Sequence, residues 1–210
     1  MSQTTELRTE ADSPKRQAVI EAASELFIAQ GYGAVSMDAI ARAAGVSKAT
    51  LYAHFASKDR LFATIINEAC QQNMAASALI PEAEDDLAAA LTALGQQMLR
   101  FLLEDRAIAI HRVVVAESAR FPELGRAFYE NGPAAFRRSF GSWIEAQTAA
   151  GRLAASDPGI AGEQFVGMLR GTGVFLRVSL GVPPAPTEAE IDATVAAAVR
   201  TFLKAYSPEA

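Results

Sequence analysis

The sequence predicts an all-α protein with three helices at the N-terminus, a long fourth helix and a larger helical region, about nine helices in all. Alternation of apolar and polar residues, which is typical of strands, is rare. The periodic segments are rich in Ala, Leu, Glu, Gln and Arg, which favour helices. Serine or aspartate followed by proline, a pattern typical of helix starts, occurs at 13–14 and at 157–158.

The first helix is expected to begin at Ser13-Pro14 and to end at Gly31, because glycine commonly follows the last turn of a helix. Its apolar stripe consists of Val19, Ala22, Ala23, Leu26 and Phe27. This stripe predicts that one side of the helix is buried.

Serines and a glycine delimit the next three helices. Ser36 is expected to cap the second helix and Gly45 to end it. Ser47 is expected to cap a third helix that runs to about Phe55. Ser57 is expected to cap the fourth helix, which a proline at position 81 closes.

The sequence of the remaining chain predicts five more helices, and the whole sequence predicts a division into domains. These helices are expected at about 85–104, 106–120, 122–150, 158–180 and 187–205. Asn131-Gly132-Pro133 should break or kink the third of them, and Thr187 with Glu190 has the pattern of a capping box. The predicted domains are a flexible arm at 1–12, a small helical domain at 13–57 and a larger helical domain at 58–206.

Composition narrows the possible classes of protein. Half of the 210 residues are hydrophobic and 20% are charged, which is typical of a packed globular protein. A single cysteine cannot form an intramolecular disulfide, which favours a reducing cytoplasm, and no apolar run is long enough to cross a bilayer. The net charge of −5 lies entirely outside residues 1–60, where seven basic and seven acidic side chains balance. Charge therefore permits a nucleic-acid partner at the N-terminus without proving one.

The segment DAIARAAGVSKATLYAHF, residues 38–55, has the dimensions of a helix-turn-helix. Gly45 can adopt a positive φ at little steric cost, so the chain can reverse direction within a few residues. Leu51 and Phe55 are four residues apart and are expected to share the buried face of the second helix of the pair.

The other face of this second helix is expected to point outward. It carries Lys48, Ala49, Tyr52 and Ala53, with Thr50 at its flank. Small side chains allow close approach to another surface, and hydroxyls and an amine can bond to polar groups there. Such a face suits a groove of double-stranded DNA.

The segment GYGAVSMDAIARAAGVSKATLYAHFASKDRLF closely resembles the DNA-binding part of the TetR family of transcriptional regulators, and the resemblance runs from about residue 15 to 62. AESARFPELGRAFYENGP and AAGRL…DP look like the ligand-binding part of the AcrR/AefR-like branch. The resemblance implies DNA contacts at matching positions. Base edges would be met by Lys48, Ala49 and Thr50, and phosphates by Ser36, Ser47, Tyr52, His54 and Lys58.

The predicted helix at 158–180 contains four glycines, at 162, 167, 171 and 173, each costing about 1 kcal/mol relative to alanine. Close approach of another helix would offset that cost. In the family that the chain resembles, the last two helices form a four-helix dimer interface, which implies a homodimer through the helices at about 158–180 and 187–205. The alternative is tight packing within one subunit.

Aromatic and sulfur-containing side chains in the larger region are candidates for lining a small-molecule cavity, although such residues are more often simply core. These candidates are Met98, Phe101, Phe140, Trp143 and Met168. The polar side chains of Gln147 and Thr172 could orient a ligand that is mainly apolar. Here too the expectation of a ligand comes chiefly from the family resemblance.

The predicted function is a DNA-binding transcriptional regulator, a repressor by family habit, that binds a palindromic operator as a homodimer and is released by a small, largely hydrophobic effector. The alternative is an all-helical sensor or carrier of small molecules with a structural N-terminal motif. An enzyme is not predicted, because no acid/base pair, activated nucleophile or metal cluster has a persuasive spacing. No cofactor, metal site or membrane partner is predicted either.

Overall fold

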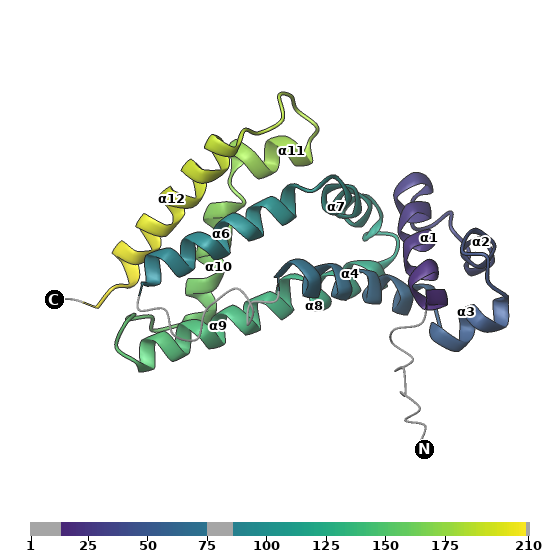
Figure 1. Ribbon diagram of the computed structural model, residues 1–210, viewed down its shortest axis with the longest axis horizontal. Helices are drawn as coiled ribbons and strands as arrows, with labels where there is room; N and C mark the ends of the chain where they lie inside the picture. The colour runs from purple at the N-terminus through teal and green to yellow at the C-terminus, as the bar shows by residue number, and fades with distance from the viewer. Residues whose placement is uncertain (1–13, 75–85, 209–210) are drawn as a thin grey trace, which may run out of the picture. The chain divides into compact units, whose positions relative to one another are not determined.

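The computed structural model describes residues 14–74 and 86–208, so the predicted arm at 1–12 and the predicted end of the fourth helix lie outside the described residues. The chain divides into two compact units. Unit 1 comprises 1–66 and 113–128, and unit 2 comprises 67–112 and 129–210. Every regular element among the described residues is a helix, as predicted (Figure 1). None of these helices is long and apolar enough to cross a membrane.

Unit 1 contains helices α1 (Pro14–Gln30), α2 (Met37–Ala43), α3 (Lys48–His54) and the first part of α4 (Lys58–Met74). It extends past the predicted boundary at residue 57, and it also includes the end of α7 (Asp105–Glu117) and most of α8 (Pro122–Asn131). Sequence reasoning assigned that second segment to the larger domain. Its inclusion brings side chains from far along the chain to the first three helices.

Three predicted signals for helix ends in unit 1 are confirmed. The side chain of Ser36 accepts from the Ala39 amide at the start of α2. Ser47 caps α3 by accepting from the Thr50 amide. Gly45 has a φ of +66°, which allows the reversal between α2 and α3 and would strain any other residue.

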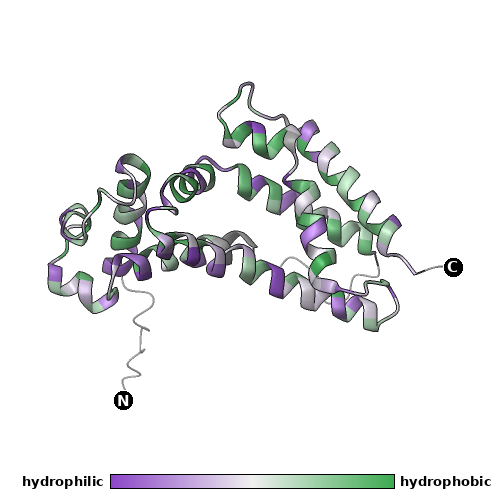
Figure 2. Cartoon of the chain, turned by 180° about the vertical axis from the view of Figure 1, so that it is seen from behind, coloured by the Kyte–Doolittle hydropathy of each residue, from purple (hydrophilic) through white to green (hydrophobic). Residues whose placement is uncertain are grey.

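Unit 2 is built around helices α6 (Leu87–Leu103), α9 (Pro133–Ala149), α10 (Pro158–Leu169) and α12 (Glu188–Tyr206). Helix α10 packs on α9 and α12, and α12 also packs on α6. Their shared core is apolar and includes Leu94, Phe140, Phe165, Val195 and Phe202. Figure 2 shows hydrophobic and hydrophilic positions on the same helices, as expected where one face is buried.

Two of the predicted long helices are interrupted. The segment at 122–150 breaks at Gly132-Pro133 into α8 and α9, as the sequence predicted. The single helix predicted at 158–180 is wrong, because α10 ends at Leu169 and the extended backbone of Gly171 precedes a π-helix, η2 (Thr172–Leu176), and a short α11 (Arg177–Ser179). Glycine at 171 and 173 leaves the chain free to depart from α-helical geometry there.

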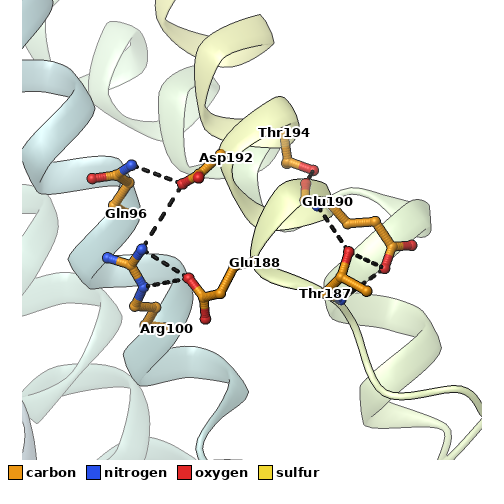
Figure 3. Close-up of polar contacts among 7 residues, drawn as sticks. All are labelled: Gln96, Arg100, Thr187, Glu188, Glu190, Asp192 and Thr194. Atoms are coloured by element: carbon orange, nitrogen blue, oxygen red, sulfur yellow. Dashed lines mark hydrogen bonds and ion pairs between the residues drawn. The ribbon is translucent and has the colours of Figure 1, made fainter.

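The start of α12 is fixed by polar contacts that Figure 3 shows. The capping box is present: the Thr187 hydroxyl accepts from the Glu190 amide, and the Glu190 carboxylate accepts from the Thr187 amide. These bonds to Thr187 and the nearby charge of Arg177 lower the pKa of Glu190. On the adjoining helix, Arg100 of α6 pairs with Glu188 at 2.9 Å. The contacts set the position of α12 against α6 within unit 2.

Candidate nucleic-acid interface

The two faces of α3 differ as the sequence predicted. Leu51 is fully buried and Phe55 is 4% exposed, so both belong to the core of unit 1. The opposite face presents Ala49, Ala53 and the phenol of Tyr52, which is 51% exposed. The result is a short helix that is anchored by large apolar side chains and shows mainly small ones outward.

The predicted base-contacting residues lie together at the start of α3. Lys48 is exposed, and its amine lies 2.5 Å from a carboxylate oxygen of Asp38 on α2. The Thr50 hydroxyl lies 2.8 Å from the Ser47 hydroxyl, and either can be the donor. Neighbouring side chains from both helices of the pair therefore hold two of the three predicted base contacts in place.

Asp38 and Lys48 allow a test of the charge on this face. Both side chains are exposed, and such ion pairs stabilise a fold by only about 0–1 kcal/mol. Changing Asp38→Asn is expected to leave the melting temperature nearly unchanged while strengthening DNA binding, because it frees the Lys48 amine and removes a negative charge. Fluorescence anisotropy with a labelled duplex measures the affinity. Weaker binding by this variant would show that the carboxylate is needed to orient the lysine.

The predicted phosphate-contacting residues differ from one another in exposure and in hydrogen bonding. Ser36 and Ser47 stand at the first turns of α2 and α3, where each hydroxyl oxygen accepts a capping bond. Tyr52 is exposed and His54 is half-buried. A capping serine can still donate its own proton to an anion, so the geometry leaves these groups available to phosphate oxygens.

Lys58 differs from the other predicted phosphate contacts. Its amine donates to the carbonyl of Tyr32 at 2.7 Å and to that of Val35 at 2.9 Å. It also lies 4.2 Å from the centroid of the Tyr32 ring. Burial lowers the pKa of this amine, and the negative charges of Glu117 and Glu123 oppose that lowering. A phosphate contact would require the amine to leave these carbonyls.

Sequence reasoning missed Glu117, the last residue of α7. Its carboxylate accepts from the amides of Tyr32 and Gly33, each at 2.6 Å. The residues are 84 and 85 positions apart in sequence, so no local pattern could have paired them. The signals that existed were the two glycines around Tyr32 and the presence of a glutamate in the segment AESARF.

The predicted effector-contacting residues all belong to unit 2, where the described ones have different surroundings. Met98 and Phe140 are part of the apolar core, and Trp143 stacks on Phe140 with ring centroids 5.7 Å apart. Phe101 is half-buried on α6, and the side chain of Thr172 lies outside the described part of the chain. Gln147 is 7% exposed, and its side-chain carbonyl has no hydrogen-bond partner among the described residues.

A groove of about 370 Å³ lies between α10 and α12, and of the predicted effector contacts it contains Met168 alone. Its other lining residues include Gln164, Gly167, Phe202 and Tyr206. The Tyr206 hydroxyl donates to Gln164 at 2.5 Å across the two helices. The groove is therefore a feature of the α10–α12 surface and not of the space around Met98 and Phe140.

Two family models match this chain. Residues 19–65 match the model of bacterial regulatory proteins of the TetR family, and residues 89–208 match the C-terminal domain of AefR-like transcriptional repressors. The two matches correspond to the helix-turn-helix of unit 1 and to most of the chain beyond α4.

Two solved structures of transcriptional regulators are similar to this chain over nearly its whole length. The solved structure of the flavonoid-responsive regulator FrrA is 41% identical, covers 93% of this chain and 98% of its own, and has a TM-score of 0.77. A TetR-family regulator from Mesorhizobium loti is 30% identical over 92% of this chain and 97% of its own, with a TM-score of 0.75.

Other relatives match the N-terminal segment only. The transcriptional activator FasR of Mycolicibacterium smegmatis is 48% identical over 52 residues, and the regulator UidR of Escherichia coli is 42% identical over 60 residues. The matched segments are 25% and 29% of this chain, and they span no more than 24% of FasR and 30% of UidR.

Proposed function

Because this chain belongs to the TetR family of transcriptional regulators, we propose that it is a repressor that binds a palindromic operator as a homodimer and is released by a small, largely apolar effector. The observation that carries the DNA-binding part is the exposed outer face of α3, with small side chains between Lys48 and Tyr52. Its proposed place of action is the cytoplasm. The relatives are regulators, and none of those named above is described as an enzyme.

The proposal assigns different roles to the predicted base contacts and to the predicted phosphate contacts. Lys48, Ala49 and Thr50 would contact base edges in the major groove, where an amine can donate to guanine and a methyl group can touch thymine. Ser36, Ser47, Tyr52 and His54 would bind phosphates and set the register of α3 without reading sequence. Lys58 is assigned to the fold of unit 1, because its amine is engaged by two carbonyls.

Selection of bound duplexes from a random DNA pool tests this proposal. The expected result is a palindrome whose half-sites lie about one helical turn, 34–36 Å, or a multiple of that apart. The affinity should fall steeply with salt concentration, because phosphate contacts release counterions. Recovery of no enriched sequence would contradict DNA binding, and a non-palindromic consensus would contradict the two-fold dimer.

One glycine of α10, Gly167, supports a dimer through this helix and α12. A Cβ on Gly162 would lie 3.1 Å from the ring of Phe140, so packing against α9 within the subunit explains that glycine. A Cβ on Gly167 would meet no atom within 4 Å, and Gly167 lines the groove between α10 and α12. Close packing within the subunit therefore leaves Gly167 unexplained, whereas approach of a second copy would account for it.

Changing Gly167→Glu is expected to weaken the dimer strongly, because a charged side chain would stand in the contact between the copies. Analytical ultracentrifugation over a range of protein concentrations measures the change. Ala149→Glu, which places the same side chain at an exposed position near the end of α9, serves as the control. A Gly167→Glu protein that dimerises like this control would contradict the proposed interface.

The effector is proposed to be a small aromatic molecule that binds in unit 2. FrrA, which is similar over nearly the whole chain, is described as flavonoid-responsive. The partnerless carbonyl of Gln147 supports a ligand that carries a hydroxyl donor, since a buried acceptor without a partner is costly. Such a ligand can release DNA only if it binds the DNA-incompetent state more tightly.

Changing Gln147→Leu is expected to raise the free energy of unfolding by about 1 kcal/mol, because it removes a buried acceptor without a partner. The same change should reduce release of DNA by a panel of flavonoids. Urea unfolding followed by Trp143 fluorescence and a DNA-release titration measure the two effects. Gln17→Leu, at an exposed position of α1, is the control for the second. Lower stability together with an unchanged response would contradict the assignment of Gln147.

A further inference from the structure

The turn between α1 and α2 receives a carboxylate from a distant part of the chain. Gly31 follows α1 with a φ of +81°, and the next two amides both point at Glu117. Tyr32 donates to one oxygen and Gly33 to the other, each at 2.6 Å. Hydrogen bonds of this length to an ionised acceptor are the strong kind, and two of them fix the turn in two directions.

The glycines of this turn leave space for that carboxylate. A Cβ on Gly31 would overlap the Glu117 carboxylate, and one on Gly33 would lie 3.0 Å from its second oxygen and 2.8 Å from the ring of Phe121. Both glycines thus stand where any larger residue would displace Glu117 or Phe121. The segment Gly-Tyr-Gly is shaped to accept the end of α7.

The opposite side of the same turn is held by Lys58. Its amine binds the carbonyls of Tyr32 and Val35, while the Tyr32 ring is buried against Phe62 and Phe121 with centroids 5.8 and 5.5 Å apart. Burial raises the pKa of the Tyr32 phenol, and the nearby carboxylates of Glu123, Asp59 and Glu117 raise it further. The amides of the turn therefore face an anion and its carbonyls face a cation.

The turn that Glu117 and Lys58 hold leads directly into α2 and α3, the helices proposed to contact DNA. Val35 precedes Ser36, which caps α2, and α2 in turn positions α3 through the Gly45 turn and the pair of Asp38 with Lys48. The acceptor that holds the turn is the last residue of α7, a helix that begins among the residues of unit 2. The carboxylate therefore ties the start of α2 to a helix that both units share.

We propose that Glu117 is a positioning residue for operator binding, which acts through the Tyr32–Gly33 turn and without contact to DNA. This inference rests on the proposed function. Its physical basis is that binding in a DNA groove requires α2 and α3 to keep one fixed orientation. A turn with two unpaired amides would sample several conformations, and α2 would then take several orientations. Loss of the carboxylate therefore lowers the fraction of protein that is competent to bind the operator.

The test compares three variants in the full-length protein, with the duplex that the wild type selects and with a scrambled duplex of equal length. Glu117→Ala removes both acceptors, and Glu117→Gln removes the charge but keeps one carbonyl. Glu123→Gln is the matched control, because Glu123 is also a carboxylate near Tyr32 and Lys58, whereas the amides of Tyr32 and Gly33 donate to Glu117. Hydrogen exchange at the amides of Tyr32 and Gly33 reports on the turn itself.

Glu117→Ala is expected to weaken operator binding about tenfold or more, which is in the usual range of a coupling between sites, with an unchanged salt dependence because no phosphate contact is lost. Scrambled DNA should bind as before, the two amides should exchange faster, and Glu117→Gln should lose less. Operator affinity within twofold of the Glu123→Gln control would overturn the proposal. Equal losses on operator and scrambled DNA would also overturn it, because they indicate general unfolding. A wild-type protein that selects no duplex contradicts the proposed function instead.

Discussion

A protein with Ala53→Glu is expected to lose operator binding by about 100-fold or more, because a negative side chain would meet phosphates on the face of α3 that approaches DNA. Ala53 is exposed, whereas Leu51 of α3 and Phe55, which directly follows α3, are buried. Glutamate and alanine are both good helix formers, so the substitution should leave the helix itself intact. Mobility-shift titration with the selected duplex measures the loss.

Ala29→Glu provides the matched control, since it introduces the same side chain at an exposed alanine of α1 in the same unit. This variant should bind the operator within a factor of about two of the wild type, because a single exposed charge change away from the contacts has little effect. If Ala53→Glu bound as well as this control, the outer face of α3 would not be the surface that meets DNA. Circular dichroism of both proteins confirms that helix content is preserved.

The helix-turn-helix could be predicted because its determinants are local. Ser36 and Ser47 each accept a hydrogen bond from an amide three residues further along the chain, and Gly45 permits the reversal through its own positive φ angle. Leu51 is buried because helical periodicity fixes its direction, and Phe55, which directly follows α3, is buried as well. The same reasoning located the break before Pro133 and the capping box of Thr187.

The contacts of Glu117 and Lys58 with the α1–α2 turn could not be predicted in this way. Gly31 was correctly expected to end α1, but the reason for glycine at 33 lies in Glu117 and Phe121, more than eighty residues further on. Lys58 stands at the start of a helix, which on sequence alone favours contact with an anion. The structure directs its amine to backbone carbonyls because the segment between α1 and α2 passes beside it.

Residue types alone do not separate core from cavity in unit 2. Met98 and Phe140 have the size and polarity of ligand-contacting residues, and they also pack with Leu94 and Phe165 in the shared core, so their contact with an effector stays a prediction. The π-helix was missed for a similar reason, since the apolar residues of η2 continue the periodicity of α10. Only the glycines at 171 and 173 indicated that α-helical hydrogen bonding would stop there.

Changing Lys58→Met is expected to destabilise unit 1 by about 2 kcal/mol, because it leaves the carbonyls of Tyr32 and Val35 without their donor while keeping a side chain of similar length. The contact of the amine with the Tyr32 ring, at 4.2 Å, is lost as well. Operator binding should fall with the folded fraction of unit 1. Native-state hydrogen exchange of the amides in α1 and α3 measures the stability of unit 1 separately from unit 2.

Lys58→Arg distinguishes this structural role from a phosphate contact. Arginine keeps the positive charge and binds phosphate at least as well as lysine, but its planar guanidinium cannot replace a compact amine between two carbonyls and an aromatic ring. The arginine protein should therefore be destabilised almost as much as Lys58→Met, with the salt dependence of DNA binding unchanged in both. Full recovery of stability and affinity with arginine would show that the charge of Lys58 matters and that its hydrogen bonds to the turn do not.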